Sequence, residues 1–150
     1  MPQISELTDH LGYWLRQVSN HVSHSFAAKL AAKEVTVAEW VLMRSLYDEA
    51  PKAPSQLAKE MGFTRGAITK LADRLIARAL VRRDASPDDG RGQTLRLTKA
   101  GAALVPELAA LADRNETECF AHLAAADRRA LQRILSETVA RLGLSATPVD

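Results

Sequence analysis

The sequence contains a single cysteine, Cys119, among 150 residues, which excludes an intramolecular disulfide framework and a cysteine-based zinc cluster. Aromatic residues make up only 5% of the chain, whereas alanine and leucine are abundant, and this balance favours helices over a β-sandwich. No run approaches ~18 uncharged apolar residues, and the chain does not start with a basic segment followed by an apolar one. These absences indicate a soluble cytoplasmic protein without a membrane span.

Positive charge is concentrated in the middle of the chain. From Arg44 to Lys99 there are 12 Lys and Arg residues against 7 Asp and Glu, whereas the remainder has 8 against 11. A basic centre between acidic ends indicates either contact with an anionic polymer or chance clustering on a solvated surface. The charge alone does not decide between the two.

Apolar residues at steps of three and four predict a long first helix over about residues 4–32. Its stripe is too long for so small a domain to cover, so part of it is expected to contact another subunit. A second helix is predicted over about 38–48, with a capping box between Thr36 and Glu39. The residues available to cap the first helix are Ser5, Thr8 and Asp9.

A helix-turn-helix is predicted next. A short helix over 55–61 ends at Gly62 in the manner of a C′ glycine, and Thr64 caps a helix over about 65–79. Two short strands, 80–84 and 93–98, then enclose a glycine-rich loop and form a β-hairpin with an extended tip.

Two further helices are predicted in the C-terminal part of the chain. The first covers about 98–123 and contains Pro106, which is expected to bend it. The second is capped by Asp127 and closed by Gly143, and residues 147–150 are expected to form a loose end.

The polar residues of the helix-turn-helix are of types that bind DNA, because a helix fits the major groove and its first residues reach base edges. Ser55 and Gln56 begin the first helix, where backbone N–H groups suit phosphate oxygens. Arg91 lies near the hairpin tip, from which a long cation can enter the minor groove. Each basic residue alone is best explained as a solvated surface charge. That explanation does not suit the whole group, which lies on the exposed face of one helix-turn-helix and its wing. The residues assigned to the second helix and its start are Thr64, Arg65, Gly66, Thr69, Lys70 and Arg74.

This order of elements, together with several short motifs, resembles the MarR family of multiple-antibiotic-resistance-type regulators. The wing sequence followed by Leu-Thr-x-x-Gly is the most specific part of the resemblance, which extends over nearly the whole chain. The stretches that carry it are Val37–Leu42, Ser55–Ala58, Thr64–Leu75, Leu80–Arg83, Asp89–Gly92 and Leu97–Gly101.

The resemblance implies a mainly α protein, namely a winged helix-turn-helix with a small β-hairpin wing and long N- and C-terminal dimerisation helices. One subunit would span 1–150, with a DNA-binding lobe at 35–100 and dimerisation helices at 1–34 and 101–146. Such a homodimer would regulate transcription, usually as a repressor, from a palindromic operator with half-sites ~34 Å apart.

The resemblance also assigns roles in the wing and has two departures. Arg91 matches the arginine that enters the minor groove, and Asp89 matches the acid thought to hold it. Ala79 stands where the family often has glycine, which predicts a different helix end because alanine resists a positive φ. Gly90 replaces a frequent basic residue, which predicts one phosphate contact fewer per wing.

Many family members release DNA when a small aromatic or anionic ligand binds between the dimerisation helices and the lobe. The alternative for the tryptophans and Met43 is ordinary core packing. His21 and His24 are spaced as metal ligands can be, but without a third ligand surface polarity is the better explanation, and neither a metal nor a cofactor is expected. The residues assigned to the ligand pocket are Trp14, His21, His24, Trp40, Met43 and Tyr47.

The other function classes have less support. Cys119 lies beside acidic residues and does not match the N-terminal thiols of redox-sensing relatives, which favours a buried apolar role over redox sensing. The chain has no nucleophile elbow, P-loop, dinucleotide glycine pattern or HExxH motif, so an enzyme is not expected. The remaining alternative is a winged-helix module that contacts proteins and does not bind DNA.

Overall fold

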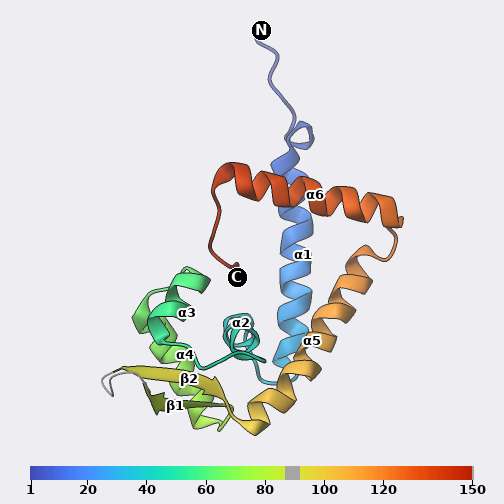
Figure 1. Cartoon of the computed structure of the whole chain (residues 1–150). Coiled ribbons are helices and arrows are strands. Elements are labelled where there is room, and N and C mark those ends of the chain that lie inside the picture. The colour runs from blue at the N-terminus through green and yellow to red at the C-terminus, as the bar shows by residue number, and fades with distance from the viewer. Residues whose placement is uncertain (87–91, 150) are drawn as a thin grey trace.

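The computed structural model describes residues 1–86 and 92–149, and it consists of helices with a small antiparallel hairpin at one edge (Figure 1). The mainly helical winged fold predicted from the sequence is therefore confirmed. Its elements are η1 (Leu7–Asp9), α1 (Leu11–Ala31), α2 (Val37–Leu46), α3 (Pro54–Met61), α4 (Arg65–Ala77), β1 (Val81–Ala85), β2 (Gln93–Leu97), α5 (Lys99–Phe120) and α6 (Ala125–Leu142).

The core lies between α2, α3, α4 and the hairpin. The C-terminal end of α1 and the N-terminal half of α5 also contribute to it. Burial of apolar side chains supplies most of the driving force for folding. Each helix therefore turns one apolar stripe inward and leaves its polar face exposed. The side chains with no exposed surface include Leu30, Leu42, Leu57, Ile68, Leu75, Leu95 and Leu108.

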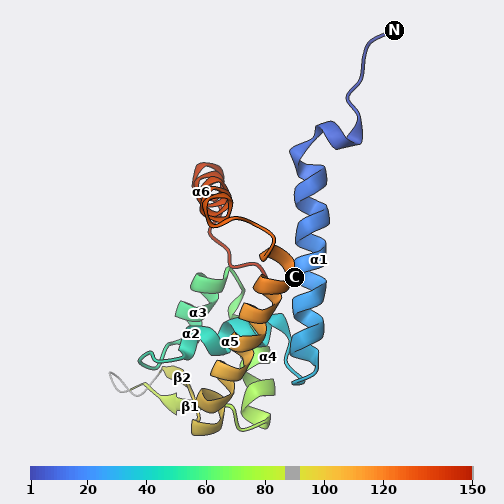
Figure 2. The ribbon, with the colours of Figure 1, turned by 90° about the vertical axis from the view of Figure 1, so that its right-hand side faces the viewer.

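The long helices extend away from this core. In Figure 1, α1 and α5 extend together from the lobe and α6 follows the far end of α5, while Figure 2 shows α6 set apart from α1. Figure 2 shows the same separation from the side, with the hairpin at one end and the N-terminal segment beyond α6 at the other. Exposed apolar residues gather on the N-terminal half of α1 and on α6.

Several predicted helix ends are confirmed by their caps. The Thr36 hydroxyl accepts a hydrogen bond from the Glu39 N–H (3.1 Å), and the Glu39 carboxylate accepts one from the Thr36 N–H (3.2 Å). Gly62 ends α3 with φ +71° and Gly143 ends α6 with φ +66°, a conformation that glycine adopts without steric cost.

Two predicted caps are wrong. The first long helix begins at Leu11, because the Asp9 carboxylate accepts a hydrogen bond from the Glu6 N–H (2.9 Å) and closes the separate turn η1. The extended backbone of His10 then separates η1 from α1. Asp127 does not cap α6 either, because the helix starts two residues before it, after Ala124.

The α4–β1 connection also differs from expectation. Ala79 takes φ +58°, the left-handed conformation that alanine was expected to avoid, and it bears steric strain there. Two hydrogen bonds fix the turn, from the Ala79 N–H to the Ile76 carbonyl and from the Leu80 N–H to the Leu75 carbonyl (2.9 Å each). The Thr98 hydroxyl also donates to the Ala79 carbonyl (2.6 Å).

The C-terminal tail is not a loose end. After Gly143 the chain turns back towards α3, where the Thr147 hydroxyl donates to the Glu60 carbonyl oxygen (3.4 Å). Ala146 lies so close to Gly62 that a Cβ at Gly62 would be 2.6 Å from the Ala146 Cβ. Val149 is half-buried against the core. The tail therefore connects α6 with the helix-turn-helix.

Candidate nucleic-acid interface

The structure places α4 so that one face is buried and the other is open to solvent. The Thr64 hydroxyl accepts a hydrogen bond from the Ala67 N–H (3.1 Å) and starts the helix, while its apolar stripe fixes the rotation about the helix axis. The buried residues of α4 are Ile68, Leu71, Ala72 and Leu75. The exposed residues are Arg65, Gly66, Thr69, Lys70, Asp73, Arg74 and Ala77.

Two of these exposed cations have no acidic partner among the described residues, namely Arg65 and Lys70. The Thr69 hydroxyl donates to the Arg65 carbonyl (3.0 Å) and keeps its acceptor capacity. Arg74 is farther along the helix, with its guanidinium 3.9 Å from the buried Glu39 carboxylate. The first two turns of α4 therefore carry positive charge that the described part of the protein leaves unneutralised.

Gly66 adds space to this face. A Cβ on Gly66 would have the Thr64 Oγ1 as its nearest neighbour, at 4.0 Å. The fold therefore does not require glycine here, although glycine lowers helix stability by about 1 kcal/mol relative to alanine in a helix interior. A residue without a side chain lets another molecule approach the helix backbone closely.

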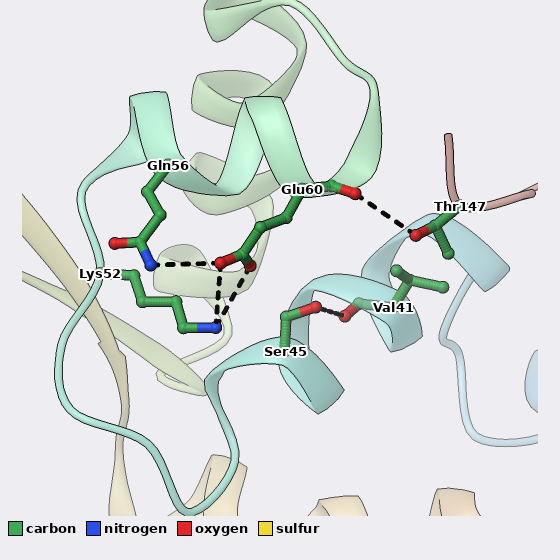
Figure 3. A network of polar contacts seen from close by, with 6 residues as sticks. All are labelled: Val41, Ser45, Lys52, Gln56, Glu60 and Thr147. Carbon is green, nitrogen blue, oxygen red and sulfur yellow. Dashed lines mark hydrogen bonds and ion pairs between the residues drawn. The ribbon is translucent and has the colours of Figure 1, made fainter. Parts of the chain in front are cut away.

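The start of α3 has fewer free backbone N–H groups for a phosphate than the sequence predicts. Pro54 has no N–H, and the Gln56 N–H bonds back to the Ala53 carbonyl (3.0 Å). The Ser55 N–H is therefore the one donor left for an anion among the first three residues of this helix. The Gln56 side chain donates to the Glu60 carboxylate (3.1 Å), which also accepts from Lys52 (3.2 Å), as Figure 3 shows.

The two strands place a second group of cations beside α4. Arg82 lies directly opposite Arg96 in the antiparallel register, an arrangement that repels unless an acid lies near. The Asp84 carboxylate provides it, 3.0 Å from the Arg82 guanidinium and 3.1 Å from that of Arg96. The Arg83 guanidinium bonds the Asp73 carboxylate at 2.8 Å and joins the hairpin to α4.

The residues expected at the hairpin tip, Asp89 and Arg91, lie outside the described residues, and so does Gly90. Their assignment therefore remains a prediction. The sequence reasoning did not single out Arg82 and Arg96, although their opposition follows from the predicted strands once the register is known.

The residues predicted to form a ligand pocket are spread over different environments. Met43 has no exposed surface and belongs to the core, and Trp40 packs edge-to-face on Phe26, with ring centroids 6.4 Å apart. Trp14 is 52% exposed and donates its indole N–H to the Thr8 carbonyl (3.0 Å). His24 is exposed and Tyr47 is half-buried, while His21 lines a groove between α1 and α5.

Cys119 is half-buried, less than the sequence predicts. The described residues contain no group of three or more His, Cys, Asp and Glu that could hold a metal ion. No helix within 1–86 or 92–149 is long and apolar enough to cross a membrane.

A short helix, a tight turn, a helix with an exposed basic face and a β-hairpin together define a winged helix-turn-helix protein. Residues 35–92 match the family model described as MarR family. Over 134 residues the chain is 25% identical to the HTH-type transcriptional repressor NicR of Pseudomonas putida. The matched region covers 89% of this chain and 85% of NicR. It is 30% identical over 94 residues to the multiple antibiotic resistance protein MarR of Escherichia coli, covering 63% of this chain and 65% of MarR.

Solved structures agree with these matches. A mutant of E. coli MarR in complex with operator DNA superposes with a TM-score of 0.76 at 26% identity, over 86% of this chain and 93% of that chain. A MarR family protein of Mycobacterium tuberculosis in complex with p-aminosalicylic acid gives 0.67 at 26% identity, over 86% and 98%. Sequence and fold together support a MarR-type winged-helix regulator.

Proposed function

We propose that this chain acts in the cytoplasm as a homodimer that binds a palindromic double-stranded DNA operator, represses transcription and is released by a small aromatic or anionic ligand. Three similarities support the proposal. E. coli MarR has been solved with operator DNA, NicR is named a repressor, and the M. tuberculosis protein has been solved with p-aminosalicylic acid.

The exposed face of α4 is the observation that carries the proposal. Arg65 and Lys70 lie within the first two turns of the helix, without acidic partners in the described parts of the chain, and Thr69 lies between them. Arginine and lysine bind guanine edges and phosphates, and a threonine hydroxyl binds either. We assign these three residues to base and phosphate contacts in the major groove.

The other assigned residues would contact the DNA backbone. Ser55 would contribute its free backbone N–H and its hydroxyl to a phosphate, whereas Gln56 must first leave Glu60. Thr64 would act mainly by capping α4, and Arg74 would reach a phosphate from the end of the exposed face. Asp89 and Arg91 keep the wing role that the family resemblance implies.

The dimer assignment rests on apolar side chains that one subunit does not cover. Within the segments assigned to dimerisation, 1–34 and 101–146, a stripe on α1 and a stripe on α6 stay exposed. Burial of such stripes at ~25 cal/mol per Å² is a typical driving force for association. The exposed residues are Leu7, Leu11, Trp14, Leu15 and Val18 on the N-terminal side, and Leu131, Ile134, Leu135, Val139 and Leu142 on α6.

Binding-site selection from random DNA, followed by titration of the selected duplex, tests the proposal. Lys70→Ala is expected to weaken binding to the selected duplex by about tenfold, the cost of one charged contact. Arg133→Ala on α6, which also removes one exposed cation, is the matched control and should leave affinity unchanged. Failure to select any sequence at low salt would contradict the proposal and favour the protein-contact module.

A further inference from the structure

Residues 144–149, called the tail below, connect α6 directly with the helix-turn-helix. None of the described residues of α6 is buried within this chain, and an ion pair between Arg128 and Glu116 (2.8 Å) joins its first turn to the end of α5. Figure 1 shows α6 at the far end of the molecule from the hairpin, with the tail running from it back towards α3. The tail therefore spans the distance between the helix assigned to dimerisation and the lobe.

Three contacts hold the tail on the lobe. Ala146 lies against the turn after α3, because a Cβ added at Gly62 would fall 2.6 Å from the Ala146 Cβ and 3.2 Å from its Cα. Val149 is half-buried and packs against the apolar core. The Thr147 hydroxyl donates to the Glu60 carbonyl oxygen (3.4 Å), as Figure 3 shows. That carbonyl is one of the last four of α3, which have no partner within the helix.

The tail is short and conformationally restricted. Pro148 fixes its own φ and favours extended backbone at the residue before it, Thr147. The three steps from Gly143, which ends α6, to Ala146 span at most about 11 Å when fully extended. The end of α6 therefore cannot move far from α3 while the tail keeps its contacts.

The helix that the tail contacts is joined to other parts of the DNA-binding lobe. The Glu60 carboxylate accepts hydrogen bonds from the Gln56 amide (3.1 Å) and the Lys52 ammonium (3.2 Å). The Lys52 backbone in turn pairs with Leu95 of β2, with N···O distances of 2.8 and 3.1 Å. A displacement of α3 would therefore reach both Gln56 and the hairpin.

We propose that the tail is a strap that holds the helix-turn-helix at a fixed distance and angle from α6, and so sets the half-site spacing that the proposed dimer accepts. This inference rests on the proposed function, which assigns α6 to the dimer interface and α4 to the DNA. The two α4 helices of a dimer fit two half-sites only when their separation matches the helical repeat of the duplex. A lobe that can tilt spends time outside that geometry, and the apparent affinity falls with the competent fraction.

Hydrogen exchange of the full chain without DNA tests the strap itself. Val149→Asp puts a charge on the core contact and should release the tail. Ser145→Asp adds the same charge at an exposed residue of the tail and is the matched control. Amides at the end of α3 and around Gly62 should exchange about fivefold faster in Val149→Asp than in Ser145→Asp, because local opening becomes easier. Equal exchange in the two variants would overturn the strap and leave the proposed function standing.

Titration of the selected duplex, and of duplexes one base pair longer or shorter between the half-sites, tests the consequence for DNA. Light scattering should show both variants with the mass of wild type, because Val149 lies outside the α6 stripe. Val149→Asp should bind the selected duplex about tenfold more weakly, as expected if its lobes are competent for about a tenth of the time. It should also lose less affinity on the altered spacings than Ser145→Asp does.

Two results would overturn the assignment of spacing to the tail. One is an equal proportional loss of affinity on all three duplexes, which general destabilisation would produce. The other is tighter binding by Val149→Asp, which would make the tail an inhibitor of DNA binding. Failure of wild type to select any duplex would instead contradict the proposed function, and the exchange measurement would still decide whether the tail restrains α3.

Discussion

At Gly101 the first turn of α5 passes against the Leu80 carbonyl oxygen, and a Cβ would fall well inside contact distance of that oxygen. This approach explains the glycine of the Leu-Thr-x-x-Gly motif. Leu80 also accepts a hydrogen bond from the Thr98 N–H (3.0 Å), and the Thr98 hydroxyl accepts one from the Gly101 N–H (3.0 Å). The α4–β1 connection and the first turn of α5 are therefore fixed to each other at this point.

Gly101→Ala should accordingly lower the free energy of unfolding by about 2–4 kcal/mol, as strong overpacking against backbone does. Chemical denaturation monitored by circular dichroism measures the change. Gly66→Ala is the matched control because its Cβ meets open space, and its stability should be unchanged or up to about 1 kcal/mol higher. The same control should weaken DNA binding if the α4 face lies against a duplex. Equal stability of the two variants would contradict this interpretation of Gly101.

Among the secondary-structure elements, α1 carries an apolar surface that the described part of this chain leaves uncovered. Leu15 and Val18 are about half exposed although they lie on the apolar stripe. An apolar stripe left open on a helix of 21 residues indicates contact with another molecule.

A double change, Leu15→Glu with Val18→Glu, should therefore convert the proposed dimer to monomers, because two buried carboxylates would face an apolar surface. Sedimentation or light scattering measures the mass. Gln17→Glu is the control, since Gln17 is exposed on another side of the same helix and should remain dimeric. A monomeric wild type, or a double variant of unchanged mass, would refute the assignment of α1 to the interface.

The sequence was informative about elements and weaker about their ends. Apolar spacing and the Thr36, Gly62 and Thr64 signals located the helix-turn-helix, because local hydrogen bonds and periodicity decide those features. The predictions for the start of α1 and for the turn at Ala79 are wrong. At the first position the Asp9 hydrogen bond outweighs the local preference, and at the second the tertiary contacts of the turn do. The exposed face of α4 followed from periodicity, whereas the α1–α5 groove depends on side chains about 85 to 90 residues apart.

On the scale of the whole molecule, the basic and acidic segments of the sequence lie in different parts of the structure. The basic middle of the sequence forms the helix-turn-helix and hairpin, while the acidic segments form the long helices that extend away from it. A field concentrated at one end of a molecule steers it towards an anionic partner in one orientation.

Affinity for the selected duplex should therefore fall by about 10³-fold between 50 and 200 mM salt if a dimer neutralises ~6 phosphates. Fluorescence anisotropy over a salt series measures the slope. A scrambled duplex should show lower affinity but a comparable slope, because phosphate contacts do not depend on sequence. A slope near zero would contradict a DNA-binding role.

The tail that returns from α6 to Glu60 has a practical consequence for anyone who labels this protein. A group attached at that end would follow Val149, which packs against the core, so it would disturb the contact between the tail and α3. The same group attached ahead of Met1 would emerge beyond α6, far from the hairpin. A tag at the N-terminal end would therefore leave the contact between the tail and α3 intact.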